Sequence, residues 1–369
     1  MKSPTITAAS LLEVALPLNK PFTTGFGTLY DRNTLLVRLE SETGKVGWGE
    51  AAILKDPIYL EEWLNGSYQF IQEYLLPVVM KETISSLEFS QKIAGLRRNN
   101  ISKFAVETAL WSLEASESLI PEWKLLGGER AKIQTGASIG MQPSIERTLI
   151  EVKEALNQGL TRIKLKIEPG WDFELVRAVR EKYPDIMLMV DANSSYTLKD
   201  IATLQSLDEF NLIMMEQPLA YDDIIDHAKL AKVLKTPICL DESICSSEDA
   251  RKAIEIGACK IINVKPARVG SLYEVQRINE LARENGIQLW CGGMLESDIG
   301  KIPNLACASL SEFSLPADIS SWQTYFSSTC TDLDTSYSHG IFTLDDQTGL
   351  TTHVDEEWIR RYTVRRVDL

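Results

Sequence analysis

The sequence predicts an α/β barrel of seven or eight strand–helix units, preceded by a separate α+β unit. From about residue 131, short apolar runs alternate with amphipathic helices, and this alternation indicates parallel strands. Equivalent run ends recur about every 25 residues, a normal length for one strand–helix unit. The 369-residue chain exceeds one ordinary compact domain and suits a large barrel or two domains.

The first 128 residues are expected to form the α+β unit. Strand-like runs come first, at residues 11–16, 33–40 and 46–50, with a turn at 41–44 and a loop at 20–30. Helical patterns follow at 59–80, 85–98 and 101–118. The unit ends near Gly127 and Gly128, where the character of the sequence changes.

The barrel is expected to occupy residues 129–318. Its strands are predicted at 133–138, 162–167, 186–191, 211–216, 237–241, 260–265 and 288–291, with a weaker eighth at 313–315. Helical patterns such as 172–182 and 247–256 fill the gaps. Residues 319–369 do not continue the alternation of strands and helices, and they are expected to fold back onto the first unit.

Composition excludes several classes of partner. A formal net charge of −14 argues against nucleic acid and anionic membranes, because both demand basic patches. No apolar run reaches the ~18–20 residues that span a bilayer, and residues 1–16 lack the apolar core of a secretory signal. The six cysteines form no C-x-x-C pair and are expected to be reduced core residues, so the expected location is the cytoplasm.

Three acidic residues end successive predicted strands. Asp191, Glu216 and Asp241 each follow an apolar run, with equal separations of 25 residues. They therefore belong to the carboxyl-terminal face of the barrel, where active sites lie. Three converging carboxylates need a cation to remain ionised together, and oxygen-only ligation favours Mg²⁺, with Mn²⁺ as a possible substitute.

Lysines flank this acidic set on both sides. Lys164 and Lys166 lie on one strand two residues apart, so both side chains enter the same space. Lys265 ends the run that follows Asp241, on the far side of the expected metal. A substrate carboxylate at the metal would present its α-carbon between the lysines. This arrangement suits removal of a proton next to a carboxylate, with Lys166 as base and Lys164 crowding it. Arg268 is expected either near Lys265 or at the surface.

Each of these residues has an ordinary explanation when taken alone. An acidic residue at a strand end is more often a solvated rim group or a helix cap, and Lys-x-Lys is usually an exposed strand face. Six charged positions in constant register on five successive strands are much harder to explain in that way.

Six stretches carry a resemblance to a known family. They are residues 162–170 (RIKLKIEPG), 190–196 (VDANSSY), 215–219 (MEQPL), 239–245 (CLDESIC), 260–270 (KIINVKPARVG) and 290–296 (WCGGMLE), with weaker likeness at 47–51 (GWGEA). With them the sequence resembles the enolase superfamily, its muconate-lactonizing subgroup, and there the o-succinylbenzoate synthases and N-acylamino acid racemases. The general pattern of a lysine base with Mg²⁺ is known for this superfamily.

The resemblance implies a fold, a chemistry and a set of site residues. The fold is an enolase-like (β/α)7-8 barrel whose N-terminal α+β unit caps the barrel mouth and is completed by the C-terminal segment. The implied ligands are Asp191, Glu216 and Asp241, with Lys166 as base and Lys265 as opposing cation. Loops 20–30 and 51–59 would set specificity. Substrate contacts are expected at the strand ends, at Ser138, Asn193, Gly292, Gly293 and Met294.

The implied reaction is a metal-dependent syn dehydration in menaquinone biosynthesis. The substrate is a small carboxylate, 2-succinyl-6-hydroxy-2,4-cyclohexadiene-1-carboxylate, and the enediolate formed by Lys166 is stabilised by the metal. The alternative is N-acylamino acid racemisation or dipeptide epimerisation with Lys166 and Lys265 as two bases, and the motifs do not separate the two. The family likeness also suggests a homo-oligomer.

Two departures from the family pattern follow the seventh strand. Asp298 stands where a glycine is usual, and the usually arginine-containing segment reads Lys301-Ile302-Pro303-Asn304. We expect Asp298 to face outward or to pair with Lys301.

Two rival interpretations belong to other classes of protein. Residues 136–140 (GASIG) match the G-x-S-x-G turn of α/β-hydrolases, with His339 or His353 as a possible partner of Ser138. A catalytically inactive binding protein on the same scaffold is the other rival. The hydrolase interpretation leaves the register of carboxylates and lysines unexplained, and the intact charged set argues against an inactive protein.

Overall fold

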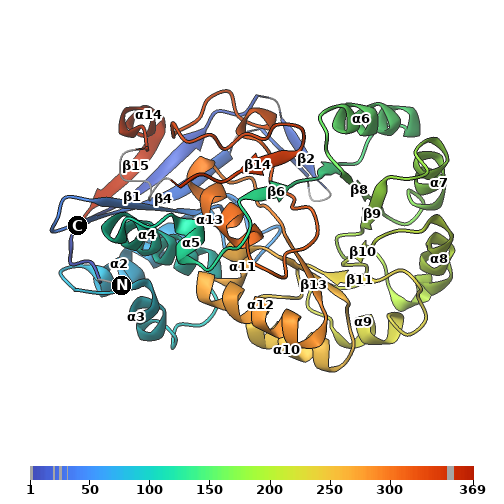
Figure 1. Ribbon diagram of the computed structural model, residues 1–369, viewed down its shortest axis with the longest axis horizontal. Helices are drawn as coiled ribbons and strands as arrows, with labels where there is room; N and C mark the ends of the chain where they lie inside the picture. The colour runs from blue at the N-terminus through green and yellow to red at the C-terminus, as the bar shows by residue number, and fades with distance from the viewer. Residues whose placement is uncertain (1–2, 20, 25–26, 31, 347–352) are drawn as a thin grey trace.

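The computed structural model describes residues 3–346 and 353–369, except residues 20, 25, 26 and 31. A four-stranded sheet with its helices forms one side of the molecule, and a barrel of parallel strands forms the other (Figure 1). The C-terminal strand lies in the first sheet, beside the N-terminal strand. Within the described residues, no helix combines the length and apolarity needed to cross a membrane.

The first sheet is antiparallel, in the order β15-β1-β4-β5. Its strands are β1 (Ile6–Leu16), β4 (Arg32–Ser41), β5 (Val46–Ala51) and β15 (Thr363–Asp368). The turn between β4 and β5 contains Gly44 with φ +79°, a conformation that glycine adopts without strain. The three N-terminal strands match the prediction, although β1 begins five residues before the predicted run. The predicted loop at 20–30 contains the short hairpin β2 (Phe22–Thr24) and β3 (Gly27–Leu29), and part of that loop lies outside the described residues.

One long helix, α4 (Asn100–Ser118), packs against β5. Two glycines of the GWGEA motif make this contact possible, because a Cβ on Gly47 or Gly49 would lie 2.0 Å from a carbonyl oxygen of α4. The remaining helices of this unit are α1 (Leu64–Phe70), a π-helical turn (Ile71–Leu75), α2 (Leu76–Val79), α3 (Ser86–Lys92) and α5 (Glu122–Leu125).

The helix predicted at 59–80 is shorter and interrupted. It begins at Leu64, because the preceding residues form a loop that carries Tyr59 to the barrel mouth. Pro77 has no N–H to donate and lies just after the π-helical turn, where the regular hydrogen-bond ladder is broken.

Seven parallel strands form the barrel sheet in sequence order. They are β7 (Ala137–Ile139), β8 (Arg162–Lys166), β9 (Met187–Asp191), β10 (Met215–Glu216), β11 (Ile238–Leu240), β12 (Ile261–Val264) and β13 (Gln288–Cys291). The α-helices after successive strands are α6 (Ile145–Asn157), α7 (Phe173–Lys182), α8 (Ile201–Ser206), α9 (Ile225–Leu230), α10 (Ser247–Glu255), α11 (Pro266–Val269), α12 (Leu272–Asn285) and α13 (Asp298–Ala308). Side chains such as Met189, Met214, Cys239 and Trp290 fill the barrel interior.

Two predicted strands differ from the structure. The run 133–138 is divided into β6 (Lys132–Gln134), which pairs with β14 (Ile341–Thr343), and the barrel strand β7. Gly136 lies between them and packs closely on β8, where a Cβ would lie 2.5 Å from the carbonyl oxygen of Arg162. In the run 211–216 the regular strand β10 contains only Met215 and Glu216. Asn211 adopts a left-handed conformation with φ +50°, and Ile213 N and Met214 O still hydrogen bond to the backbone of β9.

Residues 312–318 close the ring in place of a regular eighth strand. On one side Leu315 N donates to Leu289 O at 3.3 Å and Asp318 N donates to Cys291 O at 2.8 Å. On the other side Gly136 N donates to Ala317 O at 2.9 Å. Pro316 lacks an N–H, which explains why this weak strand is irregular.

The C-terminal segment returns to the first sheet, as predicted. Strand β15 pairs antiparallel with β1, with Leu11 opposite Val367, and α14 (Glu356–Tyr362) packs beside it. Phe326, Cys330 and Ile359 join β1 residues in a second hydrophobic cluster. The predicted fold class is therefore confirmed. Five of the six cysteines are buried as predicted, whereas Cys245 is only partly buried. Their reduced state stays a prediction. The domain boundaries at 128 and 318 stay predictions.

Candidate active site

The charged residues predicted at the strand ends meet at one end of the barrel. Asp191 ends β9 and lies in register with Glu216 of β10 and Lys166 of β8. Asp241 and Lys265 directly follow β11 and β12. Because the carboxyl ends of parallel barrel strands share one face, these side chains approach the same mouth.

Lys166 lies beside Asp191 and Asn193. Its Nζ is 2.5 Å from Asp191 Oδ2, and it also donates to Asn193 Oδ1. The Lys166 side chain is 23% exposed, compared with 5% for Lys164 and 12% for Lys265. Among these three lysines, Lys166 therefore has the most exposed side chain.

Lys265 lies on the opposite side of the acidic set. Its Nζ is 2.9 Å from Asp241 Oδ2 and 2.6 Å from the hydroxyl oxygen of Tyr59. The guanidinium of Arg268 is buried and donates to the other Asp241 oxygen, so Arg268 is not a surface residue. Burial would raise the pKa of the Asp241 carboxyl, but Arg268 and Lys265 outweigh this effect and hold the pKa well below its usual range.

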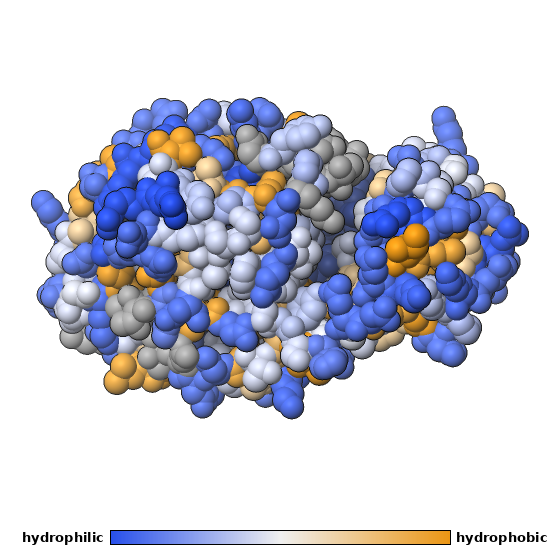
Figure 2. Space-filling model, turned by 90° about the horizontal axis from the view of Figure 1, so that it is seen from above, coloured by the Kyte–Doolittle hydropathy of each residue, from blue (hydrophilic) through white to orange (hydrophobic). Residues whose placement is uncertain are grey.

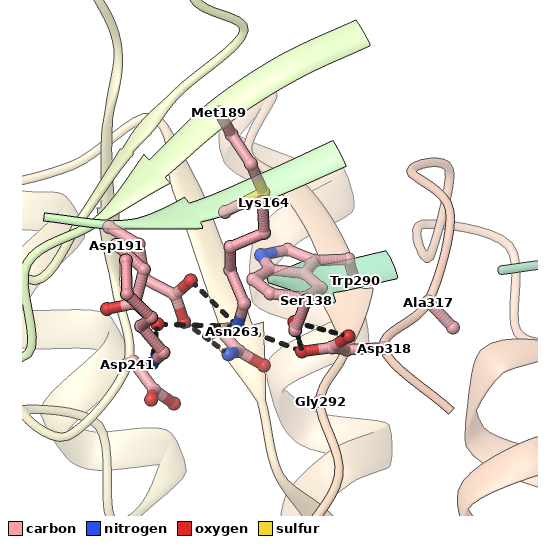
Figure 3. Close-up of polar contacts among 12 residues, drawn as sticks. Ser138, Lys164, Met189, Asp191, Asp241, Asn263, Trp290, Gly292, Ala317 and Asp318 are labelled. Atoms are coloured by element: carbon pink, nitrogen blue, oxygen red, sulfur yellow. Dashed lines mark hydrogen bonds and ion pairs between the residues drawn. The ribbon is translucent and has the colours of Figure 1, made fainter. Parts of the chain in front are cut away.

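Lys164 is almost completely buried between carboxylates from two sides of the barrel (Figure 3). Its Nζ lies 2.9 Å from Asp318 Oδ2, 3.3 Å from Glu216 Oε2 and 3.4 Å from Asp191 Oδ2. It also lies 5.0 Å from the ring centre of Trp290, within the range of a cation–π contact. Burial alone would lower the pKa of Lys164, but the three carboxylates raise it well above its ordinary value.

Glu216 is the deepest member of the acidic set. Its Oε1 accepts a hydrogen bond from Asn263 Nδ2 at 2.7 Å. Its Oε2 is buried and accepts no hydrogen bond within the described part of the chain, although Lys164 lies 3.3 Å away. Burial, with the nearby charges of Asp191 and Asp241, raises the pKa of Glu216 to about 8. A buried carboxylate oxygen of this kind fits a cation ligand.

The carboxylate oxygens of Asp191, Glu216 and Asp241 are suitable ligands for a divalent ion, although their arrangement is not that of a preformed metal site. No group of three or more His, Cys, Asp or Glu side chains in the described ranges converges closely enough to hold an ion. Instead, Asp191, Glu216 and Asp241 are each ion-paired with lysine or arginine. A bound divalent ion would take over the charge compensation that these cations provide.

A cavity of about 200 Å³ opens above these residues. The lysines 164, 166, 265 and 301 contribute to its wall, together with apolar side chains that include Leu54, Leu295 and Tyr325. Four predicted substrate contacts also line it, namely Ser138, Asn193, Gly293 and Met294. Gly292 is not among the lining residues; it packs behind the wall, where a Cβ would lie 2.3 Å from Asn263 Oδ1.

A second cavity of about 490 Å³ adjoins the first. It lies between α6 and the loop at 320–325, and it shares Ser138, Ser320 and Tyr325 with the main cavity. Seen from above, the surface is hollowed between the broad body and the smaller lobe that carries α6 (Figure 2).

The two family departures lie in a buried cluster. Asp298 is 2% exposed and lies 3.3 Å from Lys301 Nζ, so the expected pairing is present and Asp298 does not face outward. Its carboxylate also accepts hydrogen bonds from the hydroxyls of Thr329 and Thr335. Lys301 therefore contributes to the cavity wall, and Asp298 partly neutralises the charge of its ammonium group.

The geometry argues against the hydrolase interpretation. The Ser138 hydroxyl donates to the carboxylate of Asp318, at 2.6 and 2.7 Å from its two oxygens. His353, one candidate partner, lies 2.7 Å from Asp332 instead. Ser138 thus points to Asp318, the carboxylate that pairs with Lys164.

Asp318 is a site residue that the sequence did not reveal. For Tyr59 the family resemblance implied only a specificity loop at 51–59, and its contact with Lys265 was not predicted. Asp318 ends the irregular eighth strand, so it occupies the same kind of position as Asp191 and Glu216. The strand-end rule would have found it if the weak run had been extended past Pro316. Tyr59 reaches Lys265 from 206 positions away in the sequence, and no local pattern signals such a contact.

Residues 6–127 match the N-terminal domain of the mandelate racemase and muconate lactonizing enzyme family, and residues 147–358 match the enolase C-terminal domain-like family. The chain belongs to the enolase superfamily. Together the two matched regions cover most of the sequence.

Individual superfamily relatives align over nearly the whole chain. An o-succinylbenzoate synthase of Geobacillus kaustophilus is 42% identical, covering 96% of this chain and 94% of that protein. An N-succinylamino acid racemase of Thermus thermophilus is also 42% identical, covering 97% of each. A crystal structure of an enolase superfamily member from Listeria innocua superposes with a TM-score of 0.96 at 36% identity, covering 99% of both chains.

Proposed function

We propose that this chain is an o-succinylbenzoate synthase, a hydro-lyase. It converts 2-succinyl-6-hydroxy-2,4-cyclohexadiene-1-carboxylate to 2-succinylbenzoate and water. The observation that carries the proposal is the pair Lys166 and Lys265, which face one cavity from opposite sides of three buried carboxylates. Relatives with the synthase name, 37–42% identical over most of the chain, support it.

Asp191, Glu216 and Asp241 are the residues that would hold a Mg²⁺ ion, with Mn²⁺ as a substitute. Glu216 Oε2, which accepts no hydrogen bond within the described residues, is the atom that best fits this role. When bound, the ion supplies Lewis-acid stabilisation of negative charge on the substrate carboxylate. The lysine and arginine side chains that pair with these carboxylates offset their buried negative charge.

Lys166 acts first as the base and then as the acid. Its Nζ takes the proton from the carbon that bears the ring carboxylate. The ammonium of Lys265, fixed by Asp241 and Tyr59, stabilises the negative charge from the opposite face. Protonated Lys166 then returns the proton to the departing hydroxyl oxygen, so that water leaves as the ring becomes aromatic.

The proposal places the protein in menaquinone biosynthesis and in the cytoplasm. Both assignments, and a homo-oligomeric state, stay predictions from the sequence and from the family likeness.

Racemisation of N-succinylamino acids is a second candidate, because relatives at 42% and 40% identity carry that name and lysines face the cavity from both sides. Substituting Lys265→Arg separates the two chemistries. Dehydration needs a cation at this position and is expected to survive in part. Racemisation needs a second base there and is expected to fall below detection.

The direct test compares both reactions on the purified protein with Mg²⁺ present. Product formation from the cyclohexadiene substrate is followed by chromatography, and racemisation by exchange of the α-proton in D₂O with NMR detection. We expect kcat/KM for dehydration to exceed that for racemisation by at least tenfold. A ratio in the opposite direction would reassign the protein as a racemase.

A further inference from the structure

Lys164 has two sets of acidic partners, and they lie on opposite sides of its ammonium group (Figure 3). On one side are Asp191 and Glu216, the proposed metal ligands, at 3.4 and 3.3 Å. On the other side is Asp318 at 2.9 Å, which is the shortest of the three contacts. Asp318 is 127 residues beyond Asp191 in the chain and belongs to the segment that closes the barrel.

Asp318 is fixed by contacts that do not involve Lys164. Arg162 Nη2 lies 3.2 Å from its Oδ1, and the hydroxyl of Ser138 donates to its carboxylate. Its backbone N donates to Cys291 O at 2.8 Å. Its carboxylate would therefore stay in place if Lys164 lost its other partners.

A divalent ion and Lys164 compete for the same oxygens. An ion at Asp191 and Glu216 would replace the lysine as their charge partner and would repel its ammonium group. Lys164 is 5% exposed, so it has little access to water, and a buried ammonium without a counter-ion is strongly unfavourable. Asp318 is the carboxylate that remains available to it.

We infer that Asp318 is a positioning residue for the metal centre: it holds Lys164 on its own side of the mouth, so that Asp191 and Glu216 can bind a divalent ion. This inference rests on the proposed function, because it assumes the metal site at those carboxylates. It assigns Ser138 and Arg162 to the support of Asp318, in addition to any contact of Ser138 with substrate.

The test is the affinity of EDTA-treated protein for Mg²⁺, measured by isothermal titration calorimetry without substrate. Wild type, Asp318→Asn, Lys164→Met and the double variant are compared. Asparagine keeps the shape of the Asp318 side chain, and its amide oxygen can still accept hydrogen bonds from Ser138 and Arg162. We expect Asp318→Asn to weaken Mg²⁺ binding at least tenfold, because Lys164 then competes fully for Asp191 and Glu216.

The Lys164→Met background separates this account from a general charge effect. With the competing ammonium gone, Asp318→Asn is expected to change the affinity less than threefold. An equal loss in both backgrounds would mean that Asp318 acts only through its negative charge, and would overturn the inference. Asp318→Glu, which keeps the carboxylate, is expected to bind Mg²⁺ within threefold of wild type.

Two further outcomes are distinguishable. If wild type binds Mg²⁺ and Asp318→Asn binds it equally well, the inference is wrong while the proposed function stands. If wild type binds no Mg²⁺, the metal centre of the proposed function fails and the inference fails with it. Circular dichroism checks that each variant is folded. If Asp318→Asn does not fold, Asp318→Thr in both backgrounds gives the same comparison.

Discussion

Lys166 and Lys265 face one cavity but have different surroundings. Lys265 is fixed by Asp241 and by the hydroxyl of Tyr59, and Tyr59 also lies against it with a ring centre 5.0 Å from Nζ. Burial would lower the pKa of Lys265, but Asp241 outweighs it and raises the pKa above its ordinary value. A lysine held in its charged form suits electrostatic stabilisation. The more exposed Lys166 is the better candidate for proton transfer.

Substituting Lys166→Ala should therefore abolish most of the dehydration activity. We expect kcat to fall at least 10³-fold, because general acid–base catalysis typically contributes ~10²–10⁴-fold and this residue is proposed to act in both directions. Steady-state turnover of the cyclohexadiene substrate measures the loss. Lys260→Ala is the matched control, because Lys260 precedes the other end of β12 and is exposed. Turnover by Lys166→Ala within tenfold of wild type would remove Lys166 from the mechanism.

The strand-end charges were predictable, and two of their partners were not. Asp191, Glu216 and Asp241 recur at a fixed interval because each barrel unit has a similar length, so spacing alone predicts their shared face. Asp318 follows an irregular segment that breaks the interval. Tyr59 comes from another part of the fold, and only the packing of that loop against the barrel brings it to Lys265.

Among the secondary-structure elements, α13 links the barrel to the first sheet, because its N-terminus hydrogen bonds to a residue of β5. Glu50 of β5 accepts hydrogen bonds from Ser297 N at 2.9 Å, Ser297 Oγ at 2.6 Å and Gly300 N at 3.0 Å, at the N-terminus of this helix. A carboxylate there satisfies backbone donors that the helix leaves free. The loop at 293–296, which directly precedes α13, lines the cavity. The last residues of the GWGEA motif thus anchor the cavity wall.

Substituting Glu50→Gln should destabilise the protein by about 1–3 kcal/mol, because the amide cannot accept all of these hydrogen bonds and leaves buried donors unpaired. Urea unfolding measures the change. As a control, Glu248→Gln in the exposed first turn of α10 should cost less than about 1 kcal/mol, since exposed ion pairs contribute little. Equal effects of the two substitutions would show that the buried cap is not important.

Most elements were predictable because their apolar period was clear, and the failures have local causes. The run 133–138 has the composition of one strand, but its first residues pair with β14 and its last with β8. Between them Thr135 donates to Ala317 O and Ile319 O. The run 59–80 reads as one helix, but its first residues are used to reach the barrel. In both cases tertiary contacts outweigh the local pattern.

The two halves of the molecule are joined by buried acidic side chains that cap helices across the interface. Glu107 of α4 accepts from Leu272 N, at 3.0 and 3.1 Å from its two oxygens, at the start of α12 in the barrel. Burial raises the pKa of Glu107 to about 8, from an ordinary value of 4.5. Between these values the folded protein keeps a proton that the unfolded chain releases. This group therefore makes folding less favourable as the pH rises from about 4.5 to about 8.

Glu107→Gln removes this titration. The free energy of unfolding of the variant, relative to wild type, should increase with pH across that window, by up to ~1.4 kcal/mol per pH unit. Urea unfolding at pH 5, 6, 7 and 8 measures it. Thr108→Val, a neighbouring buried and uncharged substitution, should give a difference that does not vary with pH. A pH-independent difference for Glu107→Gln as well would contradict the assignment.

The sequence predicts the overall architecture, but it does not predict how the C-terminal strand pairs with the first sheet. Seven parallel strands and a weak eighth strand follow from the order of apolar runs along the chain. The return of the C-terminus was expected because the alternation of strands and helices ends after residue 318. The pairing of β15 with β1 joins residues up to 358 positions apart, as in Ser10 with Asp368, and no local signal predicts such a register. Long-range pairings of this kind depend on the assembled core.

The central claim is a metal-dependent dehydration at the mouth of this barrel. The most direct test follows the absorbance of the cyclohexadiene substrate with EDTA-treated protein, before and after Mg²⁺ is added. The account predicts no turnover without the ion and recovery of turnover when it is supplied, with Mn²⁺ giving partial recovery. Full turnover by the metal-free protein, or none with Mg²⁺ shown to be bound, would contradict it.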